Sequence, residues 1–287
     1  MLQNQPEVFC VTDYFLPGFR GGGPIRTIAN MRRQLVGEVG FAVFTRDRDL
    51  GSTEAYDGIK PNVWIETLDG PVFYSDPKKF GPRGLRRALS SRTCDVVYLN
   101  SFFSSQSSVL LYATRRWTAP DIPFLIAPRG EFSPGALAIK KTKKSAYIRT
   151  ARLLGLYRDV FWHASTDLEA EDILTQFPSA ADRIFVAPDP VSVDISASAL
   201  DHPSKRQGTL RLAFVSRISP KKNLLGLLEI LKDVKARVTL DIFGPVEDAE
   251  YWGRCEALIA QLPDSIEVRA HGAILPEEVS STFARHD

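Results

Sequence analysis

The sequence has few cysteines and no long apolar run. Its three cysteines, Cys10, Cys94 and Cys255, are odd in number and far apart, which excludes a disulfide framework. We expect them to be reduced packing residues in a reducing compartment. Nowhere do about eighteen apolar residues run together, and the start MLQNQPEVFC does not resemble a secretory signal. We therefore expect a cytoplasmic protein without a membrane-spanning helix.

The sequence also lacks a large excess of charge of one sign. Its 36 basic and 34 acidic residues leave a net charge of +2, whereas a dedicated nucleic-acid binder normally has a strongly basic face. The four histidines show neither an H-x-x-x-H spacing nor a cluster with cysteine. We expect no nucleic-acid partner and no metal site.

What the chain does have is a regular alternation of short apolar runs and helical patterns. Apolar runs of this length are typical of strands buried on both faces of a parallel sheet, with helices between them. The runs lie at 7–12, 41–45, 95–99, 123–127, 160–164, 183–187, 210–215, 237–243 and 266–270. Two shorter runs, at 63–67 and 72–74, fit a hairpin or a sheet edge.

One segment interrupts this alternation. Residues 188–207 contain Pro188, Pro190 and Pro203 together with repeated Ser and Ala, which is the composition of a linker. The sequence therefore predicts an α/β protein with two Rossmann-like, doubly wound parallel-sheet domains. We place them at 1–190 and 209–287, with a linker at 191–208.

The stretch at 210–231, LRLAFVSRISPKKNLLGLLEIL, joins a strand, a basic turn and a helix. The helix is predicted by a buried face of leucines at i, i+3, i+4 and i+7: Leu224, Leu227, Leu228 and Leu231. Arg217, Lys221 and Lys222 lie between the strand end and the helix start. Cations at such a place favour phosphate, although a solvated turn has the same composition.

This stretch resembles the donor-site segment of the retaining family-4 glycosyltransferases of GT-B fold. In that family an Arg and a Lys five residues apart hold the diphosphate of a nucleotide sugar, and Arg217 and Lys222 match them. Gly244 matches the family's glycine at the end of the second donor-domain strand, where the backbone faces the nucleotide. The resemblance implies a nucleotide-diphosphate sugar as substrate, with no metal and no other cofactor.

Two loops of the first half are further candidates. Gly21, Gly22 and Gly23 form either a flexible turn or the family's glycine-rich first loop, which faces acceptor and donor phosphate across the interdomain cleft. Arg26 follows them as a candidate for the same site. The run is no dinucleotide fingerprint, because Arg26 stands where the third small residue is needed.

The second loop is PRGEFSPGAL at 128–137, at the end of a predicted strand. It is similar to a segment of the same family, in which many members have a His near the sugar at about the place of Arg129. Arg129 therefore binds phosphate or an acidic acceptor, or it forms an internal ion pair with Glu131. We count both residues as candidates for the site.

Two features have a structural and a functional interpretation. Residues 138–158 predict one densely basic helix, which either has a solvated outer face or lies against anionic lipid. His163 lies inside the strand at 160–164, where a packed, hydrogen-bonded core histidine is more common than a catalytic one.

The resemblance covers nearly the whole chain, but in the family the segment after the position of Asp287 carries two glutamates and a helix that returns to the first domain. It implies a truncated enzyme with an incomplete second domain, inactive alone, that acts in cell-surface polysaccharide or glycolipid synthesis. The acceptor would be a saccharide or lipid-linked, with the protein at the inner face of a membrane. A degenerate, non-catalytic fragment, a nucleotide-sugar epimerase and a sugar phosphorylase are the alternatives.

Overall fold

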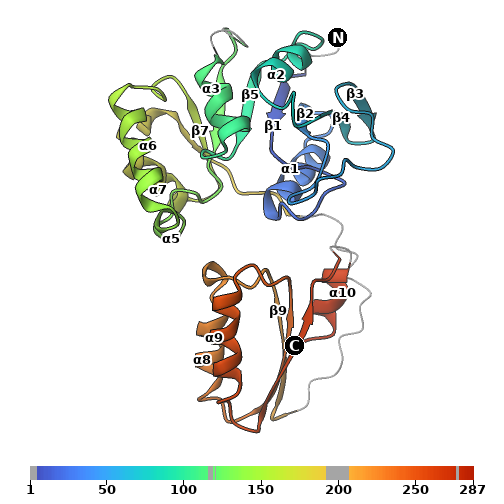
Figure 1. Cartoon of the computed structure of the whole chain (residues 1–287), viewed down its shortest axis with the longest axis vertical. Helices are drawn as coiled ribbons and strands as arrows, with labels where there is room; N and C mark the ends of the chain where they lie inside the picture. The colour runs from blue at the N-terminus through green and yellow to red at the C-terminus, as the bar shows by residue number, and fades with distance from the viewer. Residues whose placement is uncertain (1–4, 116–118, 120, 192–206, 276–277) are drawn as a thin grey trace. The chain divides into compact units, whose positions relative to one another are not determined.

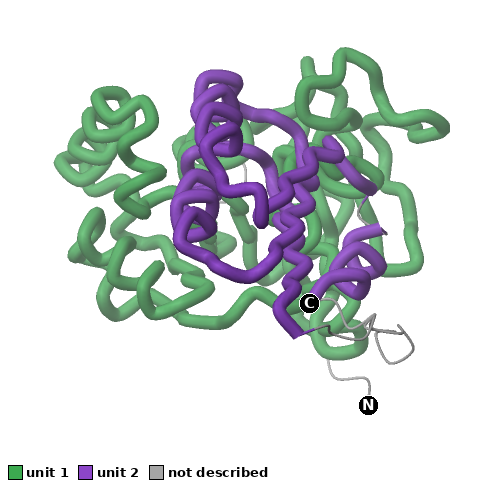
Figure 2. Tube along the Cα trace, turned by 90° about the horizontal axis from the view of Figure 1, so that it is seen from below, with its two compact units in different colours: residues 1–193 green, residues 194–287 purple. Residues whose placement is uncertain are grey.

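Alternating strands and helices build two units in the computed structural model, which describes residues 5–115, 119, 121–191, 207–275 and 278–287. Unit 1 comprises residues 1–193 and unit 2 residues 194–287 (Figure 2). The division falls within the predicted linker, most of which lies outside the described residues.

Unit 1 contains one sheet of eight strands in the order β3-β4-β2-β1-β5-β6-β7-β8. Neighbouring strands are parallel except for β3 and β4, which form the predicted hairpin at one edge. The strands are β1 Glu7–Val11, β2 Gly40–Arg46, β3 Trp64–Thr67, β4 Gly70–Ser75, β5 Val96–Asn100, β6 Phe124–Ala127, β7 Phe161–Ala164 and β8 Ile184–Val186. The chain order reverses between β1 and β5, and ligands of open α/β sheets bind outside the carboxyl ends of the strands at such a point.

The helices of unit 1 connect these strands, with α5, α6 and α7 together at the end of the unit away from β3 and β4 (Figure 1). They are α1 Gly23–Gln34, α2 Pro82–Leu89, the π-helical η1 Ser105–Val109, α3 Leu110–Ala113, α5 Pro134–Ala138, α6 Lys141–Leu153, α7 Asp167–Gln176 and the 3-10 helix η2 Pro178–Arg183. A helix lies within the predicted range 138–158, but α6 spans only Lys141–Leu153, so the predicted bounds are wrong. Lys140 has a left-handed φ of 55°, which separates α5 from α6.

A cluster of aromatic rings fills the core of unit 1 between the sheet and these helices. Phe102 lies at its centre, with ring centroids 4.8 Å from Phe132 and 4.9 Å from Tyr157. Trp162 of β7 stacks on Phe177 at 5.2 Å, and both are at most 4 % exposed. Each buried ring contributes roughly 1.5–3 kcal/mol, so this core fixes the positions of β5, β6 and β7.

Unit 2 has a sheet of three parallel strands in the order β11-β10-β9, with α8 and α9 together on one face (Figure 1). The strands are β9 Thr209–Val215, β10 Arg237–Phe243 and β11 Ile266–Gly272, and the helices are η4 Pro220–Lys222, α8 Leu224–Leu231, α9 Ala249–Ile259 and α10 Glu278–Ala284. The predicted leucine face of α8 packs against the sheet, and Asn223 caps the helix by accepting a hydrogen bond from the Gly226 N–H. Both units are therefore Rossmann-like α/β structures. None of the helices described is long and apolar enough to span a membrane.

Candidate functional site

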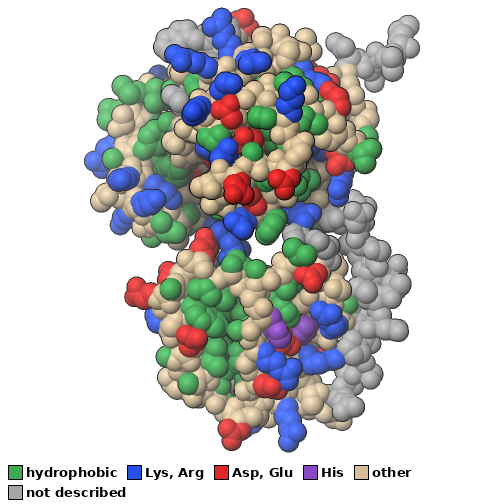
Figure 3. All heavy atoms as spheres, turned by 45° about the vertical axis from the view of Figure 1, so that its right-hand side comes forward, with side chains coloured by type: hydrophobic (Ala, Val, Ile, Leu, Met, Phe, Trp, Pro, Cys, Tyr) green, Lys and Arg blue, Asp and Glu red, His purple; other side chains and the backbone are tan. Residues whose placement is uncertain are grey.

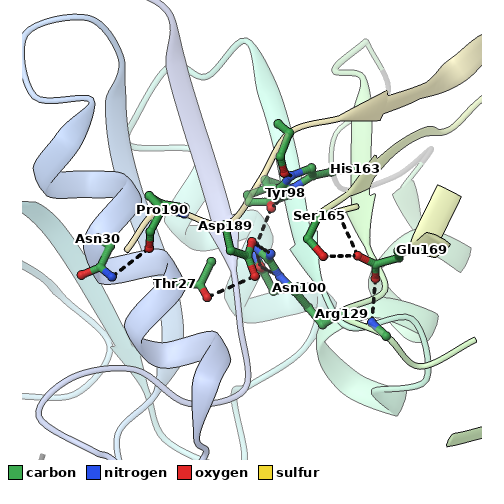
Figure 4. Close-up of polar contacts among 12 residues, drawn as sticks. Thr27, Asn30, Tyr98, Asn100, Arg129, His163, Ser165, Glu169, Asp189 and Pro190 are labelled. Atoms are coloured by element: carbon green, nitrogen blue, oxygen red, sulfur yellow. Dashed lines mark hydrogen bonds and ion pairs between the residues drawn. The ribbon is translucent and has the colours of Figure 1, made fainter. Parts of the chain in front are cut away.

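The carboxyl edge of the sheet in unit 1 brings together polar side chains from four neighbouring strand ends. Asn100 ends β5, Arg129 follows β6, Ser165 follows β7, and Asp189 lies just after β8. All four lie on the carboxyl side of the sheet, and Asn100 ends the strand that adjoins the point where the strand order reverses. This edge is the candidate site of unit 1 (Figure 4).

Arg129 is at the centre of this edge, and its guanidinium group is already occupied. It forms an ion pair with Asp189 and donates from Nη2 to Asn100 Oδ1 at 2.9 Å and to the Tyr98 hydroxyl at 2.7 Å. Its side chain is only 9 % exposed, and its backbone has a positive φ of 56°. The internal pair predicted as an alternative, Arg129 with Glu131, is wrong, because Asp189 is the partner.

A chain of hydrogen bonds continues from Arg129 into the core. The Tyr98 hydroxyl lies 2.6 Å from His163 Nδ1, and His163 Nε2 lies 2.8 Å from the Ala187 carbonyl oxygen. Since that carbonyl only accepts, Nε2 carries the proton and Nδ1 accepts from Tyr98. Burial lowers the pKa of His163, which keeps the ring neutral. The predicted packed, hydrogen-bonded histidine is confirmed.

Two glutamates hold the loop that carries Arg129. Glu131 accepts hydrogen bonds from Ser101 Oγ at 2.8 Å and from the backbone of Phe102 and Phe103, at the start of the next connection. Burial raises the pKa of Glu131 above its usual value. Glu131 thus ties the loop after β6 to the segment after β5. Its carboxylate is occupied by these hydrogen bonds within the protein.

Glu169 of α7 holds the same loop from the other side. Its carboxylate accepts from the Gly130 N–H at 2.6 Å and from the N–H and Oγ of Ser165 at 2.8 and 2.7 Å. Burial opposes the ionised form, but the hydrogen bonds from Ser165 and Gly130 lower the pKa of Glu169. Glu169, Asp189 and Tyr98 were not among the predicted site residues. In the sequence only the position of Asp189, directly after a predicted strand, could have indicated a role.

The three glycines precede and begin α1 on the same unit. Gly22 is the N-cap residue, with a positive φ of 77°, and Gly23 is the first residue of the helix. Arg26 is exposed. One turn after Gly23, Thr27 Oγ1 donates to Asp189 at 3.4 Å, so α1 contacts the partner of Arg129.

In unit 2 the two predicted phosphate ligands lie on the connection between β9 and α8. Arg217 donates from Nη1 to Glu247 Oε1 at 2.8 Å, and both side chains are nearly half exposed. Lys222 ends the short helix η4, next to Asn223 with its left-handed φ of 53°, and is exposed. Neither cation is buried, so both are accessible to a ligand at this strand end.

Gly244 has a packing role that the sequence alone does not reveal. A Cβ at this position would lie 1.8 Å from the Ser216 carbonyl oxygen, and the φ of Gly244 is 148°. The backbone at the end of β10 therefore touches the backbone at the end of β9, where the connection with Arg217 begins. Glycine is required here by protein contacts, whatever it faces in a complex.

A polar cluster in unit 2 was not predicted. Asp241 of β10 accepts hydrogen bonds from His271 at the end of β11 and, at 3.1 Å, from Nε2 of His286 after α10. His286 Nδ1 also lies 2.6 Å from the Thr282 carbonyl oxygen, which ties this ring to α10 as well as to β10. Burial opposes the ionised form, but the two histidines lower the pKa of Asp241. Figure 3 shows histidine side chains at the surface of unit 2 beside Lys and Arg.

No group of His, Cys, Asp and Glu among the described residues is arranged to hold a metal ion. The three cysteines are free, as predicted, and burial raises the pKa of the Cys10 thiol to about 12.

Comparison with solved structures supports the fold assignment. HepE from Anabaena, in complex with UDP and glucose, is similar with a TM-score of 0.64 and 13% identity, over 98% of this chain and 72% of that one. The catalytic domain of starch synthase IV from Arabidopsis thaliana, bound to ADP and acarbose, is similar with a TM-score of 0.61 and 9% identity, over 99% of this chain and 77% of that one. The lipopolysaccharide outer core galactosyltransferase WaaB is similar with a TM-score of 0.56 and 13% identity, over 98% of this chain and 72% of that one. These neighbours are GT-B glycosyltransferases, and the chain has their fold. No family model and no curated protein matches the chain.

Proposed function

We propose that this chain is a retaining, family-4 glycosyltransferase that transfers a hexose from a nucleotide-diphosphate sugar to an acceptor. The observation that carries the proposal is the pair Arg217 and Lys222, two accessible cations after the carboxyl end of β9 in the second Rossmann-like unit of a chain with the GT-B fold. The complexes of the similar HepE with UDP and of starch synthase IV with ADP support a nucleoside diphosphate as the ligand.

The proposed chemistry is electrostatic. When the bond from the sugar to the diphosphate breaks, negative charge develops on the leaving phosphate, and Arg217 and Lys222 place positive charge there. No metal ion takes part in this proposal, since the two side chains supply the charge. Gly244 lets the two strand ends come together behind Arg217.

In unit 1 we propose a role in positioning the site. Arg129 and Glu131 hold the loop after β6. We propose that the half-buried Gly21 and Gly22, the exposed Gly23 and the exposed cation of Arg26 face a substrate. The proposed acceptor is a saccharide or lipid-linked saccharide used for cell-surface polysaccharide or glycolipid. The proposed location is the cytoplasmic face of a membrane, which unit 1 contacts peripherally through α5 and α6.

Calorimetric titration with UDP, GDP and ADP tests the proposal. We expect Arg217→Ala and Lys222→Ala each to weaken binding by roughly 1.5–3 kcal/mol, the range for hydrogen bonds to charged groups. Lys221→Ala is the matched control, because Lys221 is the exposed neighbour of Lys222 and removes the same charge. Unchanged affinity in both variants, or an equal loss in the control, would refute the assignment.

A panel of nucleotide sugars then identifies the reaction. Release of nucleoside diphosphate with transfer or hydrolysis of the sugar is expected of a glycosyltransferase. Conversion of one nucleotide sugar into its epimer, or cleavage by inorganic phosphate, would instead identify an epimerase or a phosphorylase.

A further inference from the structure

The surface around α6 carries cations without any acidic neighbour in sequence. Between Glu131 and Asp159 the chain contains seven basic residues and no acidic one: Lys140, Lys141, Lys143, Lys144, Arg149, Arg152 and Arg158. Lys144 is engaged, since its Nζ donates to the Ala136 carbonyl oxygen at 2.6 Å. The side chains of Arg149, Arg152 and Arg158 are exposed and make no hydrogen bond or ion pair within the described part of the chain.

These three arginines surround two adjacent hollows between α6 and the junction of α7 with η2. The larger hollow, of about 570 Å³, is lined by Arg149 and Arg152, with Ser145 and Gln176 as further polar residues. The smaller, of about 250 Å³, is lined by Arg152 and Arg158 together with Ser179. Arg152 borders both, and no acidic residue lines either one. Their size suits a small anionic group, and the arginine side chains match phosphate in charge and geometry.

Exposed leucines lie directly beside the arginines. Leu153, which lines the larger hollow, is 80 % exposed, and Leu154 at the end of α6 is 67 % exposed. Large apolar side chains next to arginine are typical of surfaces that enter the boundary between lipid headgroups and acyl chains. A soluble phosphate compound would leave these leucines in water.

We infer that the two hollows bind the phosphate of an anionic phospholipid headgroup, while Leu153 and Leu154 enter the apolar layer beneath it. The inference rests on the peripheral membrane contact proposed above and names the residues that would make it. Single-stranded nucleic acid is a poorer occupant, because the aromatic side chains of the smaller hollow, Tyr157 and Phe177, are only 5 % and 4 % exposed and offer no stacking surface.

Vesicle flotation with the whole chain tests the inference, comparing phosphatidylcholine vesicles with and without phosphatidylglycerol at low and high salt. We expect binding only with phosphatidylglycerol, and we expect Arg149→Gln/Arg152→Gln/Arg158→Gln to weaken it by roughly 10–100-fold. Arg83→Gln/Arg86→Gln/Arg87→Gln is the matched control, because these arginines are exposed on α2 and the net charge changes equally. In the control, vesicle binding should weaken by about threefold or less, since salt screens charges that lie far from the membrane. An equal loss in both triple variants would overturn the inference in favour of a non-specific charge effect.

Two further arms separate lipid from other anions. Leu153→Ser/Leu154→Ser should weaken vesicle binding, whereas Leu68→Ser, at a fully exposed leucine on the β3–β4 turn, should not. Glycerol phosphate or an RNA oligomer that binds as tightly as the vesicles would overturn the inference. Nucleotide binding by the arginine variant should equal that of the unchanged chain, so failure here is distinct from failure of the proposed transferase.

Discussion

Two arginines at strand ends are held with very different strength. Arg217 pairs with Glu247 where both side chains are nearly half exposed, and such pairs contribute about 0–1 kcal/mol. Arg129 is only 9 % exposed and also donates to Asn100 and Tyr98, so its pair with Asp189, whose side chain is 36 % exposed, is held more firmly than a pair in which both side chains face water. A diphosphate can therefore take Arg217 from Glu247, whereas Arg129 stays with Asp189. Arg217 is the residue we expect to bind the ligand, and Arg129 the one that orders its surroundings.

A single glycine decides whether the ends of β9 and β10 can meet. We expect Gly244→Ala to destabilise unit 2 by about 1–3 kcal/mol from the backbone alone, with a further cost because its Cβ would lie 1.8 Å from the Ser216 carbonyl oxygen. Gly253→Ala is the control, since Gly253 lies exposed within α9 and a Cβ there meets nothing within 4 Å. That variant should gain about 0.4–1 kcal/mol. Urea unfolding measures both, and a Gly244 variant as stable as the unchanged chain would contradict the packing argument.

His163 links the stability of unit 1 to pH. Its pKa in the folded protein lies below the unfolded value of 6.5, so the unfolded state binds more protons as the pH falls below 6.5. The stability present above pH 6.5 is therefore lost on acidification, by at most about 1.4 kcal/mol per pH unit. We expect His163→Gln to remove this contribution to the pH dependence of the unfolding free energy. The raised pKa of Glu131 contributes in the opposite direction, but that contribution is the same in both proteins. Identical slopes in urea unfolding below pH 6.5 would show that His163 does not titrate as described.

Among the elements, the loop at 128–133 is rigid because neighbouring segments hold it from both sides. Glu131 ties it to the connection after β5, and Glu169 ties it to α7 and to the connection after β7. Helix α1 holds the partner of Arg129 in place, because Thr27 donates to Asp189 and Asn30 donates to the Pro190 carbonyl oxygen. The candidate site of unit 1 is therefore ordered before any ligand arrives.

We expect Glu169→Gln to destabilise unit 1 by about 1–3 kcal/mol, because an amide cannot accept all three hydrogen bonds of the carboxylate. Glu171→Gln, an exposed neighbour on the same helix, is the control and should change stability by less than about 0.5 kcal/mol. The free energy of unfolding in urea distinguishes them. Equal values would mean that Glu169 does not hold the loop.

At the scale of the whole molecule, the two units differ in the size of their sheets. The sheet of unit 1 has eight strands, so β1 and β5 lie far from any edge. In the three-stranded sheet of unit 2, β9 and β11 are edge strands and the central strand β10 lies between them. Fewer strands bury less apolar surface and leave backbone hydrogen bonds closer to water. We expect the amides of β9, β10 and β11 to exchange faster than those of β1, β5 and β6. Hydrogen exchange measures this, and equal protection of β10 and β1 would contradict it.

Local patterns in the sequence determined the elements. Apolar runs predicted the parallel strands, the leucine spacing predicted the buried face of α8, and the strand at 160–164 predicted a core position for His163. These features depend on side-chain polarity and on spacing within about ten residues, both of which are visible along the chain. The predicted roles of Arg217 and Lys222 come from the same kind of local evidence, and they stay predictions.

Only the tertiary structure decided which distant residues meet. Arg129 pairs with Asp189, sixty positions away, because β6 and β8 end at the same edge of the sheet, and nothing near Arg129 in the sequence marks that partner. The break at Lys140 and the contact of Gly244 with Ser216 are of the same kind. Each depends on the path of the backbone in space, which polarity and periodicity along the chain do not encode.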